Sequence, residues 1–468
     1  MLTNNKEETI MKRMEYIMLD SIEELNPTLI SHLIGKHRRE AVPRLKTLRK
    51  YYEGEHDILK RAFEDDSKPN NRIVANFCKM ISDITQGYFS GSPVTYKSKD
   101  ETYLMYLEDI YNVNVEENQN SLLAKDASIF GVGYELLYMD EDANIRMVTL
   151  RPEEVLMIYD TSVNRTPIGC IRHYEIRDYF DSANDFERVE LYTKTHIHRY
   201  IDAGGGLAYQ GTEEHFFGIC PVIPYSNNDE ELGDFEGIIK LQDAYNSAIS
   251  DQANDFEYTA DSYLVINGAE DTEDEEFMNM KRNRLILLPQ TGTASWLVKQ
   301  TDNATIESYK ERLTKDIHRF SNVPDINSEE FMNDISGTAL KYRWQAMEQA
   351  SANKERLFKE SLYQRQKAIC NILAIKGLHF SYADVTPLFK RNIPVNMNEV
   401  IQTVATLKGI VSEETLLSQL PFITSVQDEL DQIQAEQEDP YNDYFGQVGQ
   451  TNDIAGAWEN QIEVEEEI

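Results

Sequence analysis

Two amphipathic helices that flank a short β module constrain the fold of this chain more than any other feature of its sequence. Apolar residues recur at helical spacing over Phe235–Asp261 and again over Thr305–Ser321, and short runs typical of strands lie in residues 262–304 between them. At ~1.5 Å per residue the first helix is about 40 Å long. Such a hairpin buries little of its own apolar surface. We therefore expect it to be stabilised by identical neighbours packed side by side in a ring.

The module between the two helices combines short strands with an unusual charge pattern. Three strands are expected, at Tyr263–Ile266, Leu285–Leu288 and Trp296–Val298. Six of the seven residues at 270–276 are acidic. The basic residues that follow are Lys281, Arg282 and Arg284. Consecutive carboxylates in a turn point in different directions, so the acidic run is typical of a solvated loop rather than a metal site.

The second helix carries a basic stripe beside its apolar face, formed by Arg312, Lys315 and Arg319. Ordinary solvated helix faces carry such stripes as well. The sequence leaves open whether this stripe faces solvent, a channel or a neighbouring subunit. A loop is expected at residues 322–336, after the helix ends.

A very long helix is expected from Gly337 to near Ile375, with Gly377 as its C-cap. Its apolar line is interrupted by the polar residues Ser351 and Lys354. This interruption predicts a bend or a change of packing partner at mid-helix.

The first half of the chain changes from a helical period to a period of two near Gly133. Helices are expected at Ile22–Lys50, Ile73–Tyr88, Glu101–Ile110 and Asn118–Ile129, with a break forced by Pro43. Strands are expected at Tyr134–Tyr138, Ile145–Leu150, Val155–Tyr159, Ile168–Tyr174, Val189–Tyr192 and Ile197–Ile201, in one antiparallel sheet. The glycines at 204–206 lack a following Lys-Ser/Thr and predict a turn rather than a phosphate loop. The fold class is therefore α+β, predominantly helical.

The charge of the chain limits its partners. Acidic residues number 81 and basic residues 46, which gives a net charge of -35. Phosphate affinity comes mainly from Lys and Arg, so a broad grip on nucleic acid is disfavoured, whereas letting DNA slide without sticking is compatible. No apolar run is long enough to span a membrane, and the charges in the first twenty residues exclude a signal peptide. No Lys or Arg follows Lys408, and residues 436–468 read as a solvated acidic tail.

Motifs of known catalytic chemistry are absent from the sequence. It contains no Gly-x-x-x-x-Gly-Lys-Ser/Thr, Gly-x-Ser-x-Gly or His-Glu-x-x-His. His196 and His198 alternate as on one face of a strand, but no third metal ligand is evident. The four cysteines are scattered, which is typical of buried reduced thiols: Cys78, Cys170, Cys220 and Cys370. We expect no catalytic residues, no metal and no cofactor.

Six short segments carry a resemblance through their order and spacing. They are Tyr51–His56, Lys68–Val74, Gly87–Val94, Gly131–Tyr138, Pro224–Asn228 and Ser336–Leu340. Each is only moderately specific, but together they resemble the portal protein family of long-tailed phages of Gram-positive hosts. The resemblance covers roughly Leu45 to Glu436.

The resemblance implies a portal fold with a wing, a stem, a clip and a crown. The implied parts are the wing at 1–232, stem helices at 233–261 and 305–321, the clip at 262–304, a tunnel loop at 322–336, a long wing helix at 337–376, the crown at 377–435 and the acidic tail at 436–468. It also implies a ring, dodecameric in the virion, that sits at one capsid vertex. Double-stranded DNA passes through such a ring during packaging and ejection.

The resemblance further implies which residues meet partners. The tunnel loop would present Asn327, Ser328, Glu329, Glu330, Phe331 and Asn333 to DNA without sequence specificity. The clip would contact partners through Lys281, Arg282, Arg284 and Trp296. The implied partners are the terminase large subunit, the head-tail adaptor, and the major capsid and scaffolding proteins, with no membrane. The expected locations are the virion and, during assembly, the host cytoplasm.

Two other classes of protein stay open. Another head-tail structural protein is disfavoured by the long chain and by the helix–β–helix unit, since adaptors are usually short. A metal-dependent phage nuclease would need clustered basic residues beside a carboxylate triad, and none is seen in the sequence.

Overall fold

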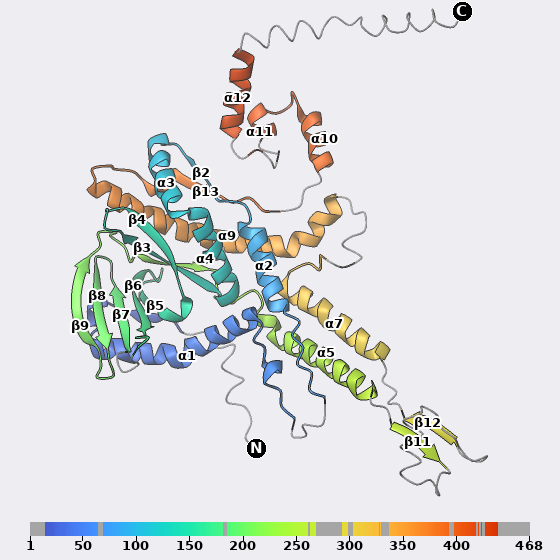
Figure 1. Cartoon of the computed structure of the whole chain (residues 1–468). Helices are drawn as coiled ribbons and strands as arrows, with labels where there is room; N and C mark the ends of the chain where they lie inside the picture. The colour runs from blue at the N-terminus through green and yellow to red at the C-terminus, as the bar shows by residue number, and fades with distance from the viewer. Residues whose placement is uncertain are drawn as a thin grey trace, which may run out of the picture. The chain divides into compact units, whose positions relative to one another are not determined.

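The computed structural model describes residues 15–438 except for residues 64–68, 181–184, 261–262, 268–292, 298–302, 327, 329–336, 393–396, 418–419, 421–422 and 424–425. The chain divides into two compact units, with the boundary after Asn392. The first unit combines helices with two main sheets (Figure 1). The α+β class predicted from the sequence is confirmed.

Helix α1 (Pro27–Glu53) is one continuous helix. Its N-cap is Asn26, whose side chain accepts a hydrogen bond from the Leu29 N–H, and it ends at Gly54 with φ of 88°. The break expected at Pro43 is wrong, because Pro43 lies inside the helix. Pro43 is exposed, as is Arg39 one turn earlier, so the carbonyl that loses its partner can be hydrated.

Three further helices precede the sheets, and short 3₁₀ turns connect the elements. The helices are α2 (Phe77–Ser90), α3 (Glu101–Asn114) and α4 (Glu116–Phe130). The turns are η1 (Ile22–Glu24), η2 (Asp57–Lys60), η3 (Pro152–Glu154), η5 (Glu236–Ile238) and η6 (Tyr382–Asp384). The expected helices in this region are confirmed, with ends that shift by a few residues.

The strands form two main sheets rather than the single sheet predicted. The six-stranded sheet has the order β1 (Ile17–Leu19), β5 (Val155–Asp160), β6 (Pro167–Ile176), β7 (Phe186–Tyr192), β8 (His196–Asp202) and β9 (Ala208–Glu214). The three-stranded sheet has the order β10 (Val222–Ser226), β3 (Val132–Met139) and β4 (Ile145–Leu150). The turn η3 separates β4 from β5, so the two hairpins pair in different sheets. Gly204 and Gly206 have positive φ in the β8–β9 connection, which confirms the predicted turn.

Helix α9 (Gly337–Ile375) has the bounds predicted for it and is capped by Gly377, whose φ is 85°. It packs on β10, and Figure 1 shows that it changes direction beyond α2. Its apolar side chains join the largest core cluster: Phe358, Leu362, Ile369, Ile372 and Leu373. Ser351 and Lys354 are both buried, and the Lys354 Nζ donates to the Ala124 carbonyl over 3.1 Å. The polar interruption in the apolar line therefore faces α4 instead of solvent.

Residues 377–392, expected to open the crown, pack in the first unit. Strand β13 (Val385–Leu388) pairs antiparallel with β2 (Thr95–Ser98), and Val385 is fully buried. The second unit holds three short helices: α10 (Met397–Leu407), α11 (Glu413–Leu417) and α12 (Val426–Glu438). In the part of the chain that the structure describes, no helix is long and apolar enough to cross a membrane.

Candidate functional site

Helices α5 (Ile239–Ala260) and α7 (Asn303–Ser321) pack against each other as the predicted hairpin. Gln252 joins them, because its amide donates to Glu307 over 2.9 Å and accepts from the Lys310 ammonium over 2.7 Å. Beyond their far ends, β11 (Tyr263–Asn267) pairs antiparallel with β12 (Thr293–Leu297) (Figure 1). The third strand expected there, Leu285–Leu288, lies outside the described residues.

The base of the hairpin is buried, and parts of its surface are not. Ile238, Ile239 and Ile317 pack with residues of α1 and α2 in one core cluster. Away from this cluster, three aromatic side chains stay exposed: Phe256 at 57%, Tyr309 at 50% and Phe320 at 64%. Large apolar side chains that a single subunit leaves in water are typical of protein–protein contacts.

The polar side of α5 is buried against an extended segment, residues 69–77, which we call the strap. Four strap N–H groups, of Asn71, Ile73, Ala75 and Phe77, donate to the side-chain oxygens of Asn254, Ser250, Asn246 and Gln242 in that order, over 2.7, 2.9, 3.0 and 2.9 Å. Gln242, Asn246 and Ser250 are fully buried. The strap backbone is therefore satisfied by helix side chains instead of by a neighbouring strand.

The spacing of this ladder follows from the two backbone geometries. Two residues of extended chain rise about 6.6 Å and four residues of α-helix about 6.0 Å, so every second strap N–H meets every fourth residue of α5. The Gln242 amide also donates to the Ala75 carbonyl over 2.6 Å, and the Asn246 amide contacts His56 Nδ1 over 2.7 Å. The ladder fixes where along the strap the hairpin begins.

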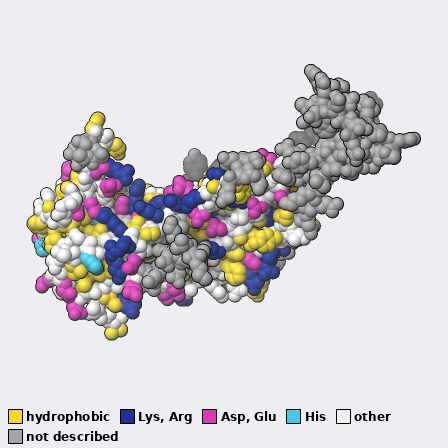
Figure 2. All heavy atoms as spheres, turned by 90° about the horizontal axis from the view of Figure 1, so that it is seen from below, with side chains coloured by type: hydrophobic (Ala, Val, Ile, Leu, Met, Phe, Trp, Pro, Cys, Tyr) yellow, Lys and Arg dark blue, Asp and Glu magenta, His cyan; other side chains and the backbone are white. Residues whose placement is uncertain are grey.

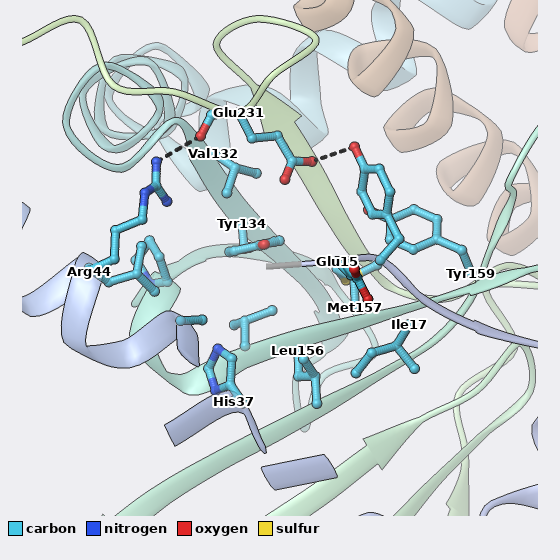
Figure 3. Close-up of a pocket in the computed structure, with 15 residues that line it drawn as sticks. Glu15, Ile17, His37, Arg44, Val132, Tyr134, Leu156, Met157, Tyr159 and Glu231 are labelled. Atoms are coloured by element: carbon cyan, nitrogen blue, oxygen red, sulfur yellow. Dashed lines mark hydrogen bonds between the residues drawn. The ribbon is translucent and has the colours of Figure 1, made fainter. Parts of the chain in front are cut away.

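A second buried contact beside the base joins Arg44 of α1 to Glu236, over 2.5 Å, and to the Glu231 carbonyl over 3.0 Å. These residues border a cavity of about 90 Å³, where Tyr16 also donates to Glu231 (Figure 3). Ligand pockets for small molecules usually measure ~300 Å³ or more. This cavity therefore suits a few water molecules rather than a substrate.

A wider groove of about 790 Å³ lies between the two sheets. Its central charges are paired: Arg172 contacts both Glu154 and Glu190, and Arg199 contacts Glu213 over 2.7 Å. A general acid or base needs a group free to exchange a proton with a substrate, and these pairs offer none. Over the described residues, no group of three His, Cys, Asp or Glu side chains is placed to hold a metal ion.

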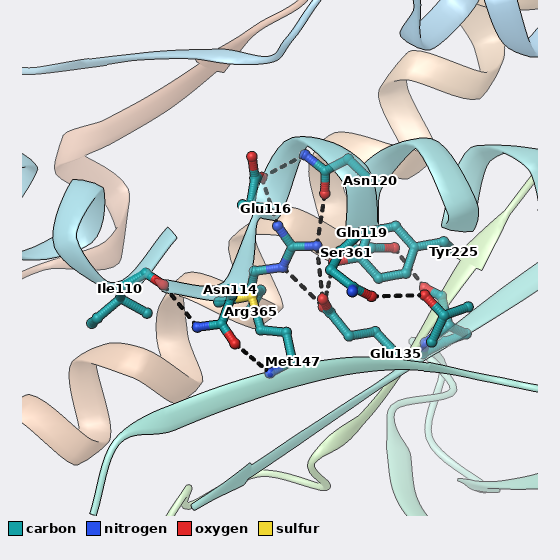
Figure 4. A network of polar contacts seen from close by, with 12 residues as sticks. Ile110, Asn114, Glu116, Gln119, Asn120, Glu135, Met147, Tyr225, Ser361 and Arg365 are labelled. Carbon is teal, nitrogen blue, oxygen red and sulfur yellow. Dashed lines mark hydrogen bonds and ion pairs between the residues drawn. The ribbon is translucent and has the colours of Figure 1, made fainter. Parts of the chain in front are cut away.

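The long helix α9 is fixed in the wing by the fully buried Arg365 (Figure 4). Its guanidinium makes two bonds to Glu135, over 2.9 and 2.8 Å, and one each to Glu116 and Asn120, over 2.8 Å. Tyr225 donates to the same Glu135 carboxylate over 2.8 Å. Burial disfavours the charge of Arg365, but Glu135 and Glu116 raise its pKa well above the usual value. The cluster joins α9 to α4 and β3.

The structure describes only part of the sequence-predicted site. Arg312, Lys315 and Arg319 lie exposed on α7, as a stripe. Trp296 lies in β12 opposite Leu264, and Ser328 donates to the Asp325 carbonyl over 2.9 Å. The other predicted residues lie outside the described residues: Lys281, Arg282, Arg284, Asn327, Glu329, Glu330, Phe331 and Asn333.

Sequence reasoning missed the ladder and the Arg365 cluster. The signal for the ladder was present as Gln242, Asn246, Ser250 and Asn254, a row of uncharged polar residues at a spacing of four. Solvated helix faces usually carry charged residues, so a neutral row points to a buried polar contact.

A helical hairpin with exposed aromatics, anchored to a mixed wing that shows no catalytic group, defines a structural subunit of a larger assembly. The family model described as "Phage portal protein, SPP1 Gp6-like" matches residues 31–441, and the chain belongs to this family. The resemblance predicted from the sequence is confirmed. Portal proteins form a ring at the capsid vertex of the phage particle.

Two curated relatives agree with this family. The portal protein of Bacillus phage SPP1 is 25% identical over 459 residues, covering 90% of this chain and 89% of the relative. The portal protein of Clostridium phage phiCD119 is 25% identical over 445 residues, covering 87% of this chain and 96% of the relative. A solved structure, the neck of an empty GTA particle, is similar with a TM-score of 0.44 and 14% identity over 74% of this chain and 90% of that one.

Proposed function

We propose that twelve copies of this chain form the portal ring, with the α5–α7 hairpins side by side around a channel for double-stranded DNA. The observation that carries this proposal is the hairpin itself, which is tightly anchored at its base and leaves Phe256, Tyr309 and Phe320 in water. Equivalent hairpins from neighbouring subunits would cover these side chains.

The surface charge supports a channel that does not hold its cargo. The net charge of -35 disfavours tight binding of a polyanion, and Figure 2 shows Lys and Arg side chains interspersed with acidic and hydrophobic ones on one face. In this proposal the tunnel loop at 322–336 contacts DNA through Asn327, Glu329, Phe331 and their neighbours. Contacts of this kind position a duplex and read no bases.

The clip at 262–304 is the proposed docking site for partners outside the capsid. It would meet the terminase large subunit during packaging and the head-tail adaptor afterwards, through Lys281, Arg282, Arg284 and Trp296. The wing and crown would meet the major capsid and scaffolding proteins, and assembly would take place in the host cytoplasm. The β11–β12 pair at the end of the hairpin supports this assignment, because it lies far from the wing core in sequence and in Figure 1.

Electron microscopy of the purified protein tests the proposal. We expect rings of twelve subunits with the hairpins lining a hole wide enough for a duplex. A compact monomer that buries Phe256, Tyr309 and Phe320 in its own interior would overturn it. A nuclease assay with Mg²⁺ or Mn²⁺ tests the enzymatic alternative, and we expect no cleavage.

A further inference from the structure

The hairpin has two outward flanks of opposite charge. The basic flank is the side of α7 that carries Arg312, Lys315 and Arg319, together with the exposed aromatics Tyr309 and Phe320. The acidic flank lies beyond the strap, on the other side of α5. It carries Glu53, Glu55 and Asp57, together with the exposed apolar residues Leu59, Phe63 and Ile73.

The basic flank points away from α5. Leu313 and Ile317 are buried and Lys310 binds Gln252, so these three residues mark the side of α7 that faces α5. At 3.6 residues per turn, the basic stripe lies on the opposite side of the helix. Arg312 pairs only along its own helix, with Asp316 over 2.7 Å. Neither Lys315 nor Arg319 forms an ion pair with an acidic residue that the structure describes.

The acidic flank is also only partly neutralised. Asp57 pairs with Lys60, and Arg61 pairs with Asp251 of α5 over 2.6 Å. Glu53 and Glu55 are exposed, and no basic side chain among the described residues pairs with either. Leu59, Phe63 and Ile73 are 42%, 40% and 37% exposed. Each flank therefore combines uncovered apolar side chains with charges that the subunit does not satisfy.

The two flanks lie on different sides of α5. The ladder attaches the strap to the face of α5 that carries Asn246 and Ser250, whereas α7 packs on the face that carries Gln252. A closed ring of identical subunits needs two different, complementary surfaces on each copy. Opposite charge beside apolar side chains is the complementarity such a contact uses.

We propose that in the ring the basic flank of each subunit lies against the acidic flank of the next subunit. The occupant of each flank is thus a second copy of this chain, and the stripe on α7 serves assembly rather than contact with DNA. This inference rests on the proposed ring. A single exposed ion pair contributes little, about 0.2–1 kcal/mol, but the contact recurs at every interface and weakens as salt screens it.

The test uses two charge-reversed proteins. One carries Arg312→Glu, Lys315→Glu and Arg319→Glu, so both of its flanks are acidic. The other carries Glu53→Lys, Glu55→Lys and Asp57→Lys, so both of its flanks are basic. We expect each protein alone to lose rings at low salt in mass photometry. An equimolar mixture is expected to regain rings, because each variant then meets the opposite charge on both sides.

The mixture makes a sharper prediction in native mass spectrometry. If one variant carries a tag of distinct mass, the two copies must alternate, so only even ring sizes with equal numbers of both copies are expected. Recovery of rings also shows that both variants fold. A control with Lys97→Glu, Lys99→Glu and Lys194→Glu changes the net charge equally at exposed positions of the wing and should keep its rings.

The outcomes separate this inference from the ring itself. Rings from each variant alone, or a mixture that assembles at random composition, would overturn the flank contact and leave the ring standing. A mixture that forms no rings while the wild type does would overturn it as well. If the wild type forms no rings under any condition, the proposed function fails first.

Discussion

Two long helices, α9 and α5, are held to the same wing by opposite means. Helix α9 depends on one buried charge, Arg365, bonded to Glu135 and Glu116. Helix α5 depends on a row of neutral side chains, each bonded to one strap N–H. A buried charge concentrates the anchor at one point and is costly to leave unpaired, whereas a ladder divides the anchor into small equal parts. The difference predicts how each region responds to substitution.

The largest effect is expected for Arg365→Met. The change leaves two buried carboxylates without a counter-charge, so we expect the free energy of unfolding to fall by about 3–5 kcal/mol. Denaturant titration followed by circular dichroism measures it. Adding Glu135→Gln should recover part of the loss. A fall below about 1 kcal/mol would show that α9 is held by its apolar contacts alone.

A smaller effect is expected for Asn246→Leu in the ladder. The substitution keeps the approximate volume but leaves the Ala75 N–H without an acceptor, so we expect a loss of about 1–3 kcal/mol. Ser247→Ala on the neighbouring position of α5 is the control and should cost less. Hydrogen exchange at Ala75, read by mass spectrometry, should speed up in the first variant only; unchanged exchange would contradict the ladder.

The two regions are also expected to differ in pH dependence. In the wing, His37 contacts His173 over 2.9 Å, and burial followed by repulsion from His173 lowers the pKa of His37 to about 3. The unfolded chain, with a pKa near 6.5, then binds one more proton than the folded chain between those values. Stability is therefore complete above about pH 6.5 and falls on acidification, by at most about 1.4 kcal/mol per pH unit from this group.

The variant His37→Asn should remove that part of the slope, which unfolding curves at pH 6.5, 5.5 and 4.5 would measure. The matched ladder variant is Ser250→Ala, which removes no titratable group and should keep the wild-type slope. Equal slopes in the wild type and His37→Asn would show that His37 does not titrate in this way.

The smallest effect is expected for Lys359→Gln, on the same helix as Arg365. Lys359 pairs with Glu355 one turn away over 2.7 Å, and both side chains reach solvent. Pairs of this kind contribute about 0.3–0.5 kcal/mol, so the unfolding midpoint should hardly move. A loss as large as that of Arg365→Met would mean that position on α9, rather than burial of charge, decides the cost.

Periodicity predicted the helices well, and it failed where partners decide. The bounds of α9 follow from its apolar spacing and from the glycine that caps it, both of which are local. Pairing of strands is not local, so the split into two sheets was missed. Strand β9 was missed because nearly all of its residues are exposed, which leaves no alternation to detect.

The site was predicted only in part for the same physical reason. The stripe of Arg312, Lys315 and Arg319 is a pattern within one helix and could be seen. Arg365 stands in the apolar line of α9 between Leu362 and Ile369, which is a signal of a buried charge, but its partners come from α4 and β3. The tunnel-loop and clip residues other than Ser328 and Trp296 remain predictions.

The ladder gives the junction between strap and α5 a repeat of its own. Each rung joins two residues of strap to four residues of helix, and the N–H groups that take part belong to the backbone, whatever the side chain. Adding two residues to the strap together with four to α5 would therefore create one more rung and leave the others matched. Adding either insertion alone would shift every rung off its partner. The arm can be lengthened only in paired steps, a rule that a designer of portals with deeper channels could follow.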